Sequence, residues 1–189
     1  MTLDTYSTLL VSASIALFVA LVAVGISYWL SVGVRARIQR VPYFWFIAAL
    51  AAIACISIAG SLVYQLVYDT PVCELCWWQR IFLYPTSVIT LVALWYKSRE
   101  THITVAVLSA FGLWYAIYHY YYHFQGFVLG NKLSLPCSYG GLMPACTDSP
   151  ILVYGFATIP FMGIMVFGSM LMFAGFAHLT LKRSVLVNG

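Results

Sequence analysis

The stretch around which the chain is organised is Pro71-Val72-Cys73-Glu74-Leu75-Cys76-Trp77-Trp78-Gln79-Arg80. It places two cysteines at Cys-x-x-Cys spacing in a short polar gap between two long apolar segments. A disulfide between Cys73 and Cys76 would close a small ring that opens and closes without unfolding the chain, so the pair is a candidate electron-transfer element. A structural disulfide or half of a zinc site would use the same spacing. The rest of the chain must distinguish these interpretations.

The composition indicates a protein whose solvent is mostly lipid. Of its 189 residues, 63% are hydrophobic and only 7% are charged. A soluble core of this size cannot bury so much apolar surface. The net charge of +4 is small and forms no basic patch, so nucleic acid is not an expected partner. We therefore expect an all-α integral membrane protein.

Five apolar segments are long enough to cross a bilayer as helices, since about 20 residues at about 1.5 Å each span a hydrocarbon core of about 30 Å. The predicted spans are residues 9–32, 43–66, 78–96, 103–124 and 151–177. A cleavable signal peptide is the alternative for the first. That run is too long for the apolar region of a signal peptide, and no basic residue precedes it, which favours a retained span.

The distribution of basic residues predicts the orientation. Five spans place the termini on opposite faces, and basic residues favour the cytoplasmic face. With the N-terminus outside, seven of the nine basic residues lie in the cytoplasm: Arg35, Arg37, Arg40, Lys97, Arg99, Lys182 and Arg183. The loops 67–77 and 126–150 then face the extracytoplasmic side, where disulfides persist. We predict a multi-pass protein of the plasma (inner) membrane with a cytoplasmic C-terminus.

Four of the five cysteines lie in these two outer loops. Cys73 and Cys76 are in the first, and Cys137 and Cys146 are in the second. Cys55 lies within an apolar span, where a free cysteine packs as a small hydrophobe. The four loop cysteines could form two static disulfides, one zinc site with four thiolate ligands, or a redox relay. An oxidising compartment disfavours the zinc site.

Three polar residues lie at similar depth near the outer ends of their spans. Arg80 follows Cys76 by one helical turn on the same face, close to a helix start that favours a thiolate. An arginine inside an apolar segment must reach the headgroups or find a partner, so Arg80 either snorkels or stabilises that thiolate and bonds the carbonyl of an electron acceptor. His119 and His123, four residues apart, suit a pocket for a flat carbonyl-bearing ring. A haem or metal site is the alternative, but matching histidines on a partner helix are missing.

Three segments resemble motifs of the DsbB family, membrane proteins that make disulfides and pass the electrons to quinone. Residues 73–80 are similar to its Cys-x-Leu-Cys-aromatic-aromatic-Gln/Glu-Arg signature. Tyr118-His119-Tyr120-Tyr121 resembles its third-helix histidine region, and Gly155-Phe156-Ala157-Thr158-Ile159-Pro160-Phe161 resembles the Thr-Ile-Pro motif that opens its last helix. The Cys-x-x-Cys loop comes first, as in that family. In the vitamin K epoxide reductase family the order is reversed.

The resemblance covers residues 43–177 and implies a four-helix transmembrane bundle there. Residues 1–42 would add one N-terminal transmembrane helix, whose role the family does not explain, and a basic cytoplasmic loop. Residues 178–189 would form a cytoplasmic tail. The cysteines of the second loop have only eight residues between them, as in short-loop members of the family.

The resemblance also implies a relay. A reduced DsbA-like thioredoxin-fold oxidase would attack Cys137 and free Cys146. Thiol–disulfide exchange would then run on to Cys73 and release the Cys76 thiolate, which reduces a quinone from the membrane pool, ubiquinone or menaquinone.

The same resemblance places Arg80 and His119 around the quinone ring, and His123 joins them as the helix neighbour of His119. No metal ligand is expected. Two other functions remain open. One is a vitamin K epoxide reductase-like enzyme that couples dithiols to quinone. The other is a non-catalytic membrane bundle stapled by structural disulfides.

Overall fold

The computed structural model describes residues 2–70, 72–130 and 151–188, and nearly all of these are helical. The elements in chain order are α1 (Leu3–Leu30), α2 (Val32–Ile38), α3 (Tyr43–Leu66), α4 (Glu74–Tyr96), α5 (Thr101–His123), the π-helical turn η1 (Phe124–Val128) and α6 (Ile159–Asn188). In the described ranges the only strand-like pairing is one isolated antiparallel bridge between Val153 and Ala157.

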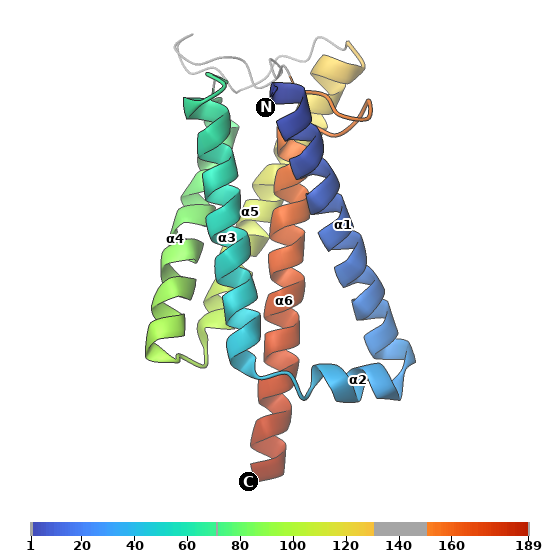
Figure 1. The fold of residues 1–189 in the computed structure, drawn as a ribbon, viewed down its shortest axis with the longest axis vertical. Helices are drawn as coiled ribbons and strands as arrows, with labels where there is room; N and C mark the ends of the chain where they lie inside the picture. Colours follow the sequence, from blue (N-terminus) through green and yellow to red (C-terminus); the bar gives the residue numbers. More distant parts are fainter. Residues whose placement is uncertain (1, 71, 131–150, 189) are drawn as a thin grey trace.

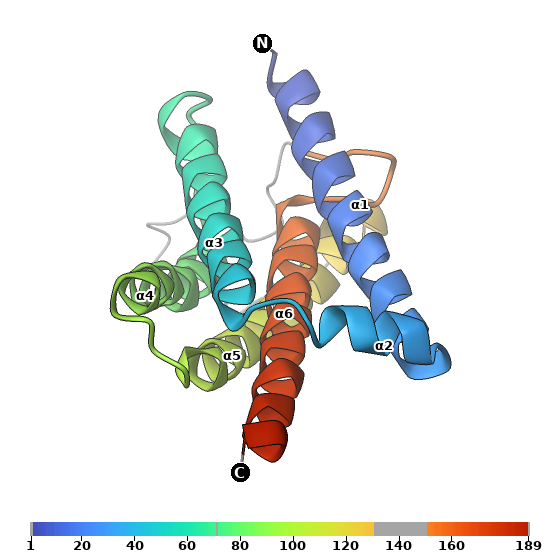
Figure 2. The ribbon, with the colours of Figure 1, turned by 60° about the horizontal axis from the view of Figure 1, so that its bottom comes forward.

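Helices α3, α4, α5 and α6 form a four-helix bundle, and α1 packs on α6 from outside it (Figure 1). The short helix α2 leads back from the C-terminal end of α1 to the start of α3 (Figure 2). The bundle core is built from apolar side chains of all four helices, among them Leu50, Leu83, Val105 and Phe167. The predicted fold class, an all-α bundle of four helices with one additional N-terminal helix, is therefore confirmed.

Four of the helices are long and apolar enough to cross a membrane: α1, α3, α5 with its extension to Gly126, and α6 as far as Lys182. Helix α4 has 23 residues and packs between α3 and α5. It falls short in hydropathy because Gln79 and Arg80 lie in its N-terminal third. Large apolar side chains such as Val19 and Phe111 are exposed on the outer faces of the helices. These features define an integral membrane protein.

Several predicted boundaries differ from the structure, and the last helix runs on to Asn188 rather than ending at residue 177. The basic residues Arg35 and Arg37 lie on α2, a separate short helix that hydropathy did not predict. Helix α4 begins at Glu74 rather than at residue 78, so Cys76 lies in its first turn and Cys73 is its N-cap residue. These shifts matter for the site, because they place the cysteine pair at a helix start rather than in a loop.

The last helix begins at Ile159, eight residues later than the predicted start at 151. Residues 153–157 form a tight turn closed by two 2.8 Å hydrogen bonds between Val153 and Ala157. Gly155 has φ +77°, a conformation that glycine adopts without steric cost and that interrupts a helix. Pro160 then occupies the first turn of α6, where a missing N–H costs nothing. The Thr-Ile-Pro motif therefore opens the last helix, as the resemblance implied.

Candidate active site

The Cys-x-x-Cys pair lies at the N-terminus of α4. Cys73 is the N-cap residue, with an extended backbone (φ −80°, ψ 167°), and Cys76 lies in the first turn. Their Sγ atoms are 3.3 Å apart and are not bonded. Only a small side-chain movement separates this dithiol from a disulfide with an S–S length of about 2.05 Å. The free amide groups of the first helical turn favour a thiolate at this position.

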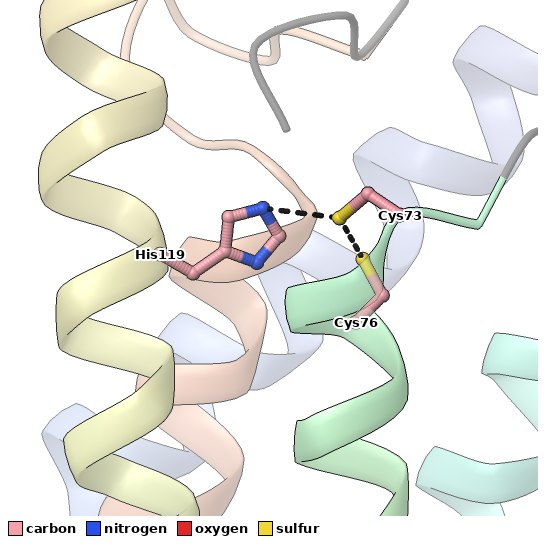
Figure 3. A group of neighbouring side chains, drawn as sticks. All are labelled: Cys73, Cys76 and His119. Carbon is pink, nitrogen blue, oxygen red and sulfur yellow. Dashed lines mark hydrogen bonds between the residues drawn. The ribbon is translucent and has the colours of Figure 1, made fainter. Parts of the chain in front are cut away.

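His119 of α5 contacts Cys73, as Figure 3 shows. Its Nε2 atom lies 3.5 Å from Cys73 Sγ, and its Nδ1 atom lies 3.0 Å from Nε2 of Gln79. The amide nitrogen of Gln79 can only donate, so Nδ1 of His119 is the acceptor. We assign the ring proton to Nε2, which then donates to the sulfur of Cys73. The histidine therefore stabilises negative charge on Cys73.

His123 lies one turn further along α5. It is fully buried, and its ring centroid is 6.3 Å from that of His119 in an edge-on arrangement. The two histidines thus share one face of α5, as their spacing predicted, but it is His119 that contacts the cysteine pair.

The side chain of Gln79 packs against α6 at Gly163, which has no side chain of its own. A Cβ atom at Gly163 would lie 2.5 Å from Oε1 of Gln79, closer than two such atoms can approach. A larger residue at this position would therefore force the Gln79 amide to shift from the place in which it bonds His119. Gln79 belongs to the motif at residues 73–80, but its sequence context alone indicated no role for it.

The Arg80 side chain is buried in the bundle, with 5% of its surface exposed. Its Nε donates to Ser61 Oγ at 2.9 Å, its Nη2 donates to the Ser61 carbonyl at 3.0 Å, and its Nη1 donates to Gln65 Oε1 at 2.6 Å. The guanidinium also lies 5.4 Å from the ring centroid of Trp77. Arg80 therefore does not snorkel. The sequence offered one signal for the partners of Arg80. Ser61 and Gln65 are polar residues four apart in the last turns of a largely apolar span.

These partners are neutral, and in the described ranges no carboxylate forms an ion pair with Arg80. A buried cation without a counter-charge is costly in an apolar bundle. An anion beside it, such as a thiolate or a reduced acceptor, would be stabilised in turn.

A cavity of about 340 Å³ lies between α1, α3, α4 and α6, and we call it the inter-helix cavity. Its volume falls within the range of small-molecule sites, roughly 300–1,000 Å³. Cys76, Gln79 and Arg80 line it near the end that holds the cysteine pair, which we call its outer end, and neither His119 nor His123 does. The cysteine pair therefore has two sides, with Cys73 turned to the histidine and Cys76 turned to the cavity.

The structure brings together five of the predicted site residues in this way: Cys73, Cys76, Arg80, His119 and His123. The other two, Cys137 and Cys146, lie outside the described residues. Cys55 is a free cysteine within α3, away from the pair, in keeping with the packing role expected for it.

Cys73, Cys76 and His119 also satisfy the spacing of a metal site. Their ligand atoms all lie within 4.8 Å of one another. Structural zinc sites use four protein ligands, and the described residues supply three. The arrangement thus offers either a partial metal site or a hydrogen-bonded dithiol beside a cavity.

A dithiol at a helix start, set in one end of an apolar bundle and beside a ligand-sized cavity, defines a membrane thiol–disulfide protein. The family model for disulfide bond formation protein DsbB matches residues 39–181. The chain belongs to the DsbB family, and it is therefore a membrane protein of disulfide bond formation. Helices α1 and α2 precede the matched region.

Named relatives point to the same activity. A probable disulfide formation protein of Coxiella burnetii is 32% identical over 123 residues, which cover 65% of this chain and 77% of that protein. Disulfide bond formation protein C of Bacillus subtilis is 32% identical over 122 residues, covering 65% and 84%. A prophage-derived disulfide bond formation protein B of the same organism is 35% identical over 108 residues, covering 57% and 68%. No solved structure gives a significant match to the chain.

Replacing Gln65 by leucine should destabilise the protein, because Nη1 of the buried Arg80 loses its 2.6 Å acceptor. A buried donor without a partner costs about 1–3 kcal/mol, and we expect the free energy of unfolding to fall by about that amount. Denaturant unfolding of the purified protein in detergent micelles measures it. Gln65→Glu is the matched control, because it keeps an acceptor for the guanidinium. Equal stability of Gln65→Leu and the wild type would show that other groups hold Arg80.

Proposed function

We propose that the protein is a protein dithiol:quinone oxidoreductase. It oxidises the reduced dithiol of a DsbA-like thioredoxin-fold protein and passes two electrons to a membrane quinone, ubiquinone or menaquinone. The observation that carries this proposal is that Cys76 lines the same cavity as the buried cation of Arg80, which pairs with no carboxylate of the described residues. A static disulfide needs neither the cation nor the cavity.

The groups around the outer end of the inter-helix cavity suit a quinone. A guanidinium has five N–H donors, and the three hydrogen bonds of Arg80 to α3 leave two for a ligand. The hydroxyl of Thr70 also lines the cavity, is buried, and has no hydrogen-bond partner among the described residues. Quinone carbonyl oxygens are acceptors for both kinds of donor. A bound quinone supplies a two-electron, two-proton acceptor at this place.

The residues of α4 and α5 would perform the inner half of the reaction, in which the Cys73–Cys76 dithiol reduces the quinone. His119 holds the Cys73 sulfur through Nε2–H, at 3.5 Å, and so favours its thiolate as leaving group and as nucleophile. Arg80 stabilises the thiolate of Cys76 on the cavity side. When the dithiol closes to a disulfide, two electrons and two protons leave it, and quinone becomes quinol. We therefore propose that His119 serves the dithiol, whereas Arg80 serves the acceptor.

The outer half of the relay is proposed from the family pattern, because Cys137 and Cys146 lie outside the described residues. A thiolate of the reduced partner attacks Cys137 of their disulfide and releases Cys146. Cys146 attacks Cys73 of the inner disulfide and releases the Cys76 thiolate. The second thiol of the partner then attacks the partner–Cys137 disulfide, which closes the partner's own disulfide and releases the Cys137 thiolate. Cys137 attacks Cys146 of the Cys146–Cys73 disulfide, which regenerates the Cys137–Cys146 disulfide and leaves Cys73 and Cys76 reduced. Each step exchanges one S–S bond for another.

The acceptor must be a stronger oxidant than the partner's disulfide for this sequence to run forward. For two electrons, about 30 mV corresponds to about 1.4 kcal/mol. A quinone pool more positive by ~100 mV would supply about 4–5 kcal/mol. A lipid-soluble quinone that reaches the bundle from the membrane meets this requirement.

We further propose that the cysteine end of the bundle is extracytoplasmic. The N-terminus of α1 and the start of α4 lie at one end of the bundle, while α2 and the C-terminus of α6 lie at the other (Figure 1). Arg35 and Arg37 on α2 and Lys182 on α6 therefore gather at the end opposite the cysteines. Basic residues favour the cytoplasmic side, and disulfides persist on the other.

Replacing Cys76 by serine should reduce quinone reduction to the uncatalysed background, since the dithiol can no longer close. The measurement is the loss of quinone absorbance when the purified protein is mixed without oxygen with quinone and a reduced DsbA-like protein. Cys55→Ser, which changes the free cysteine within α3, should keep the wild-type rate. A Cys76→Ser variant that still reduces quinone would rule out the relay. A stoichiometric metal in the purified protein would favour the metal site instead.

Replacing Gln65 by glutamate tests the charge of Arg80 without moving its side chain. The new carboxylate would pair with the guanidinium and remove its net positive charge from the cavity. Loss of one stabilising electrostatic group costs about 100-fold or more in rate at comparable sites, so we expect quinone reduction to slow by about that factor. A variant as stable and as active as the wild type would show that the cation does not assist the reaction.

Single-cysteine labelling checks the orientation. Asp4 and Lys97 are both exposed and lie at opposite ends of the bundle. An impermeant thiol reagent should label Asp4→Cys on intact spheroplasts and Lys97→Cys only after the membrane is permeabilised, each in a background in which all five native cysteines are replaced. The reverse pattern would invert the proposed topology.

A further inference from the structure

We propose that α1 is part of the acceptor site: it forms the wall against which the isoprenoid tail of the quinone lies. This inference rests on the proposed function and extends it to a helix outside the DsbB match, which begins at residue 39. Four residues of α1 line the inter-helix cavity: Leu10, Ala13, Ser14 and Leu17. They lie at positions i, i+3, i+4 and i+7, which is a single stripe along one face of a helix.

Contacts at the outer end fix the stripe toward the cavity. The Tyr6 hydroxyl donates to the Gly60 carbonyl of α3 at 3.2 Å, and the centroid of the Tyr6 ring lies 5.0 Å from that of the Tyr64 ring. Leu10 packs beside Gly60, since a Cβ at Gly60 would lie 3.5 Å from Leu10 Cδ1, an ordinary contact distance. Helix α1 therefore closes the cavity beside α3 at the level of the polar groups.

Deeper in the membrane α1 stays on α6 and departs from α3. Phe18 packs where Gly168 of α6 has no side chain, since a Cβ there would lie 2.7 Å from its ring. Figures 1 and 2 show α1 and α3 on opposite sides of α6 at this level. Leu17 of α1 and Ile56 of α3 line the cavity and yet are 38% and 64% exposed. The cavity therefore opens to the lipid between these two side chains.

The lining changes in polarity along the cavity. Arg80, Gln79 and Thr70 lie at the outer end, whereas the lining toward the opening is mainly apolar, with Leu17, Ile53 and Ile56. The polar side chains there, Ser57 and Ser169, are small. Along α6 the lining runs from Ile159 to Ser169, ten residues, or about 15 Å at about 1.5 Å per residue. A flat ring with polar oxygens and a long hydrocarbon chain matches this order. The ring lies against Cys76 and Arg80, and the tail passes α1 into the bilayer.

The small side chains of the stripe provide the width of the passage. Ala13 is small, and the hydroxyl of Ser14 donates to the Val11 carbonyl at 2.8 Å, so this serine presents no unpaired polar atom to a tail. A bulky side chain at Ser14 would fill the passage without reaching the polar end of the cavity.

Ser14→Trp tests the assignment with two quinones that share a ring, one without a tail and one with a tail of several isoprene units. We expect the KM of the tailed quinone to rise by about tenfold, the scale of a steric change in an apolar pocket, and the KM of the tail-less ring to stay within about twofold. Val19→Trp is the matched control, because Val19 is 59% exposed on α1 and does not line the cavity. It should leave both values unchanged.

The outcomes separate the two proposals. A wild type that reduces neither quinone overturns the proposed function, and this inference with it. A wild type that reduces both, with a ratio of KM values that Ser14→Trp leaves unchanged, overturns only the role of α1. Retained activity on the tail-less ring shows that the variant is folded.

A second measurement does not depend on a variant. A quinone with a photoreactive group on its tail should label peptides of α1 and α3 in the wild-type protein, and excess tailed quinone should suppress the label. Label confined to other helices, or label that the tailed quinone does not suppress because a phospholipid chain fills the passage, would overturn the assignment.

Discussion

The constraint on which the site depends is the burial of one guanidinium inside a bundle that offers it no carboxylate among the described residues. Arg80 is 5% exposed, and its hydrogen bonds go to a serine and a glutamine of α3. Because these donors are directional, they fix the rotation of α4 against α3. That rotation places Cys76, one turn away, on the wall of the inter-helix cavity. One packing arrangement of α4 against α3 therefore brings the charge of Arg80 and the sulfur of Cys76 to the same cavity.

The same rotation turns the two cysteines toward different neighbours. With Cys76 facing the cavity, Cys73 at the N-cap faces α5, where His119 lies 3.5 Å from its sulfur. Gln79 supports the ring from the other side, and it fits because Gly163 on α6 lacks a side chain. Each of the four bundle helices thus contributes to the site: α4 the cysteines, α3 the anchor of the arginine, α5 the histidine and α6 the space. A change in the packing of any one of them alters the chemistry available at the pair.

Helix α1 adds a fifth element to a bundle that the family match already accounts for. It is apolar around almost its whole circumference and touches α3 only near its outer end, so it covers the cavity without closing it completely. A helix placed in this way shapes access from the lipid rather than the chemistry of the cysteines. A helix outside the DsbB match can therefore lie next to the functional site without contacting the cysteine pair.

The sequence by itself determined the membrane class, the helical bundle with the approximate places of its helices, the cysteine pair and the place of Arg80 within an apolar segment. These are local properties: a hydropathic run, a two-residue spacing and a charge in an apolar segment are visible within a short window. Only the tertiary structure decided that Arg80 pairs with Ser61 and Gln65, that His119 contacts Cys73 rather than lining the cavity, and that α1 is part of the cavity wall. These features depend on how each helix is rotated about its axis against its neighbours. A helix that is apolar on every side carries no periodic pattern from which that rotation could be read, so packing of the whole bundle sets it.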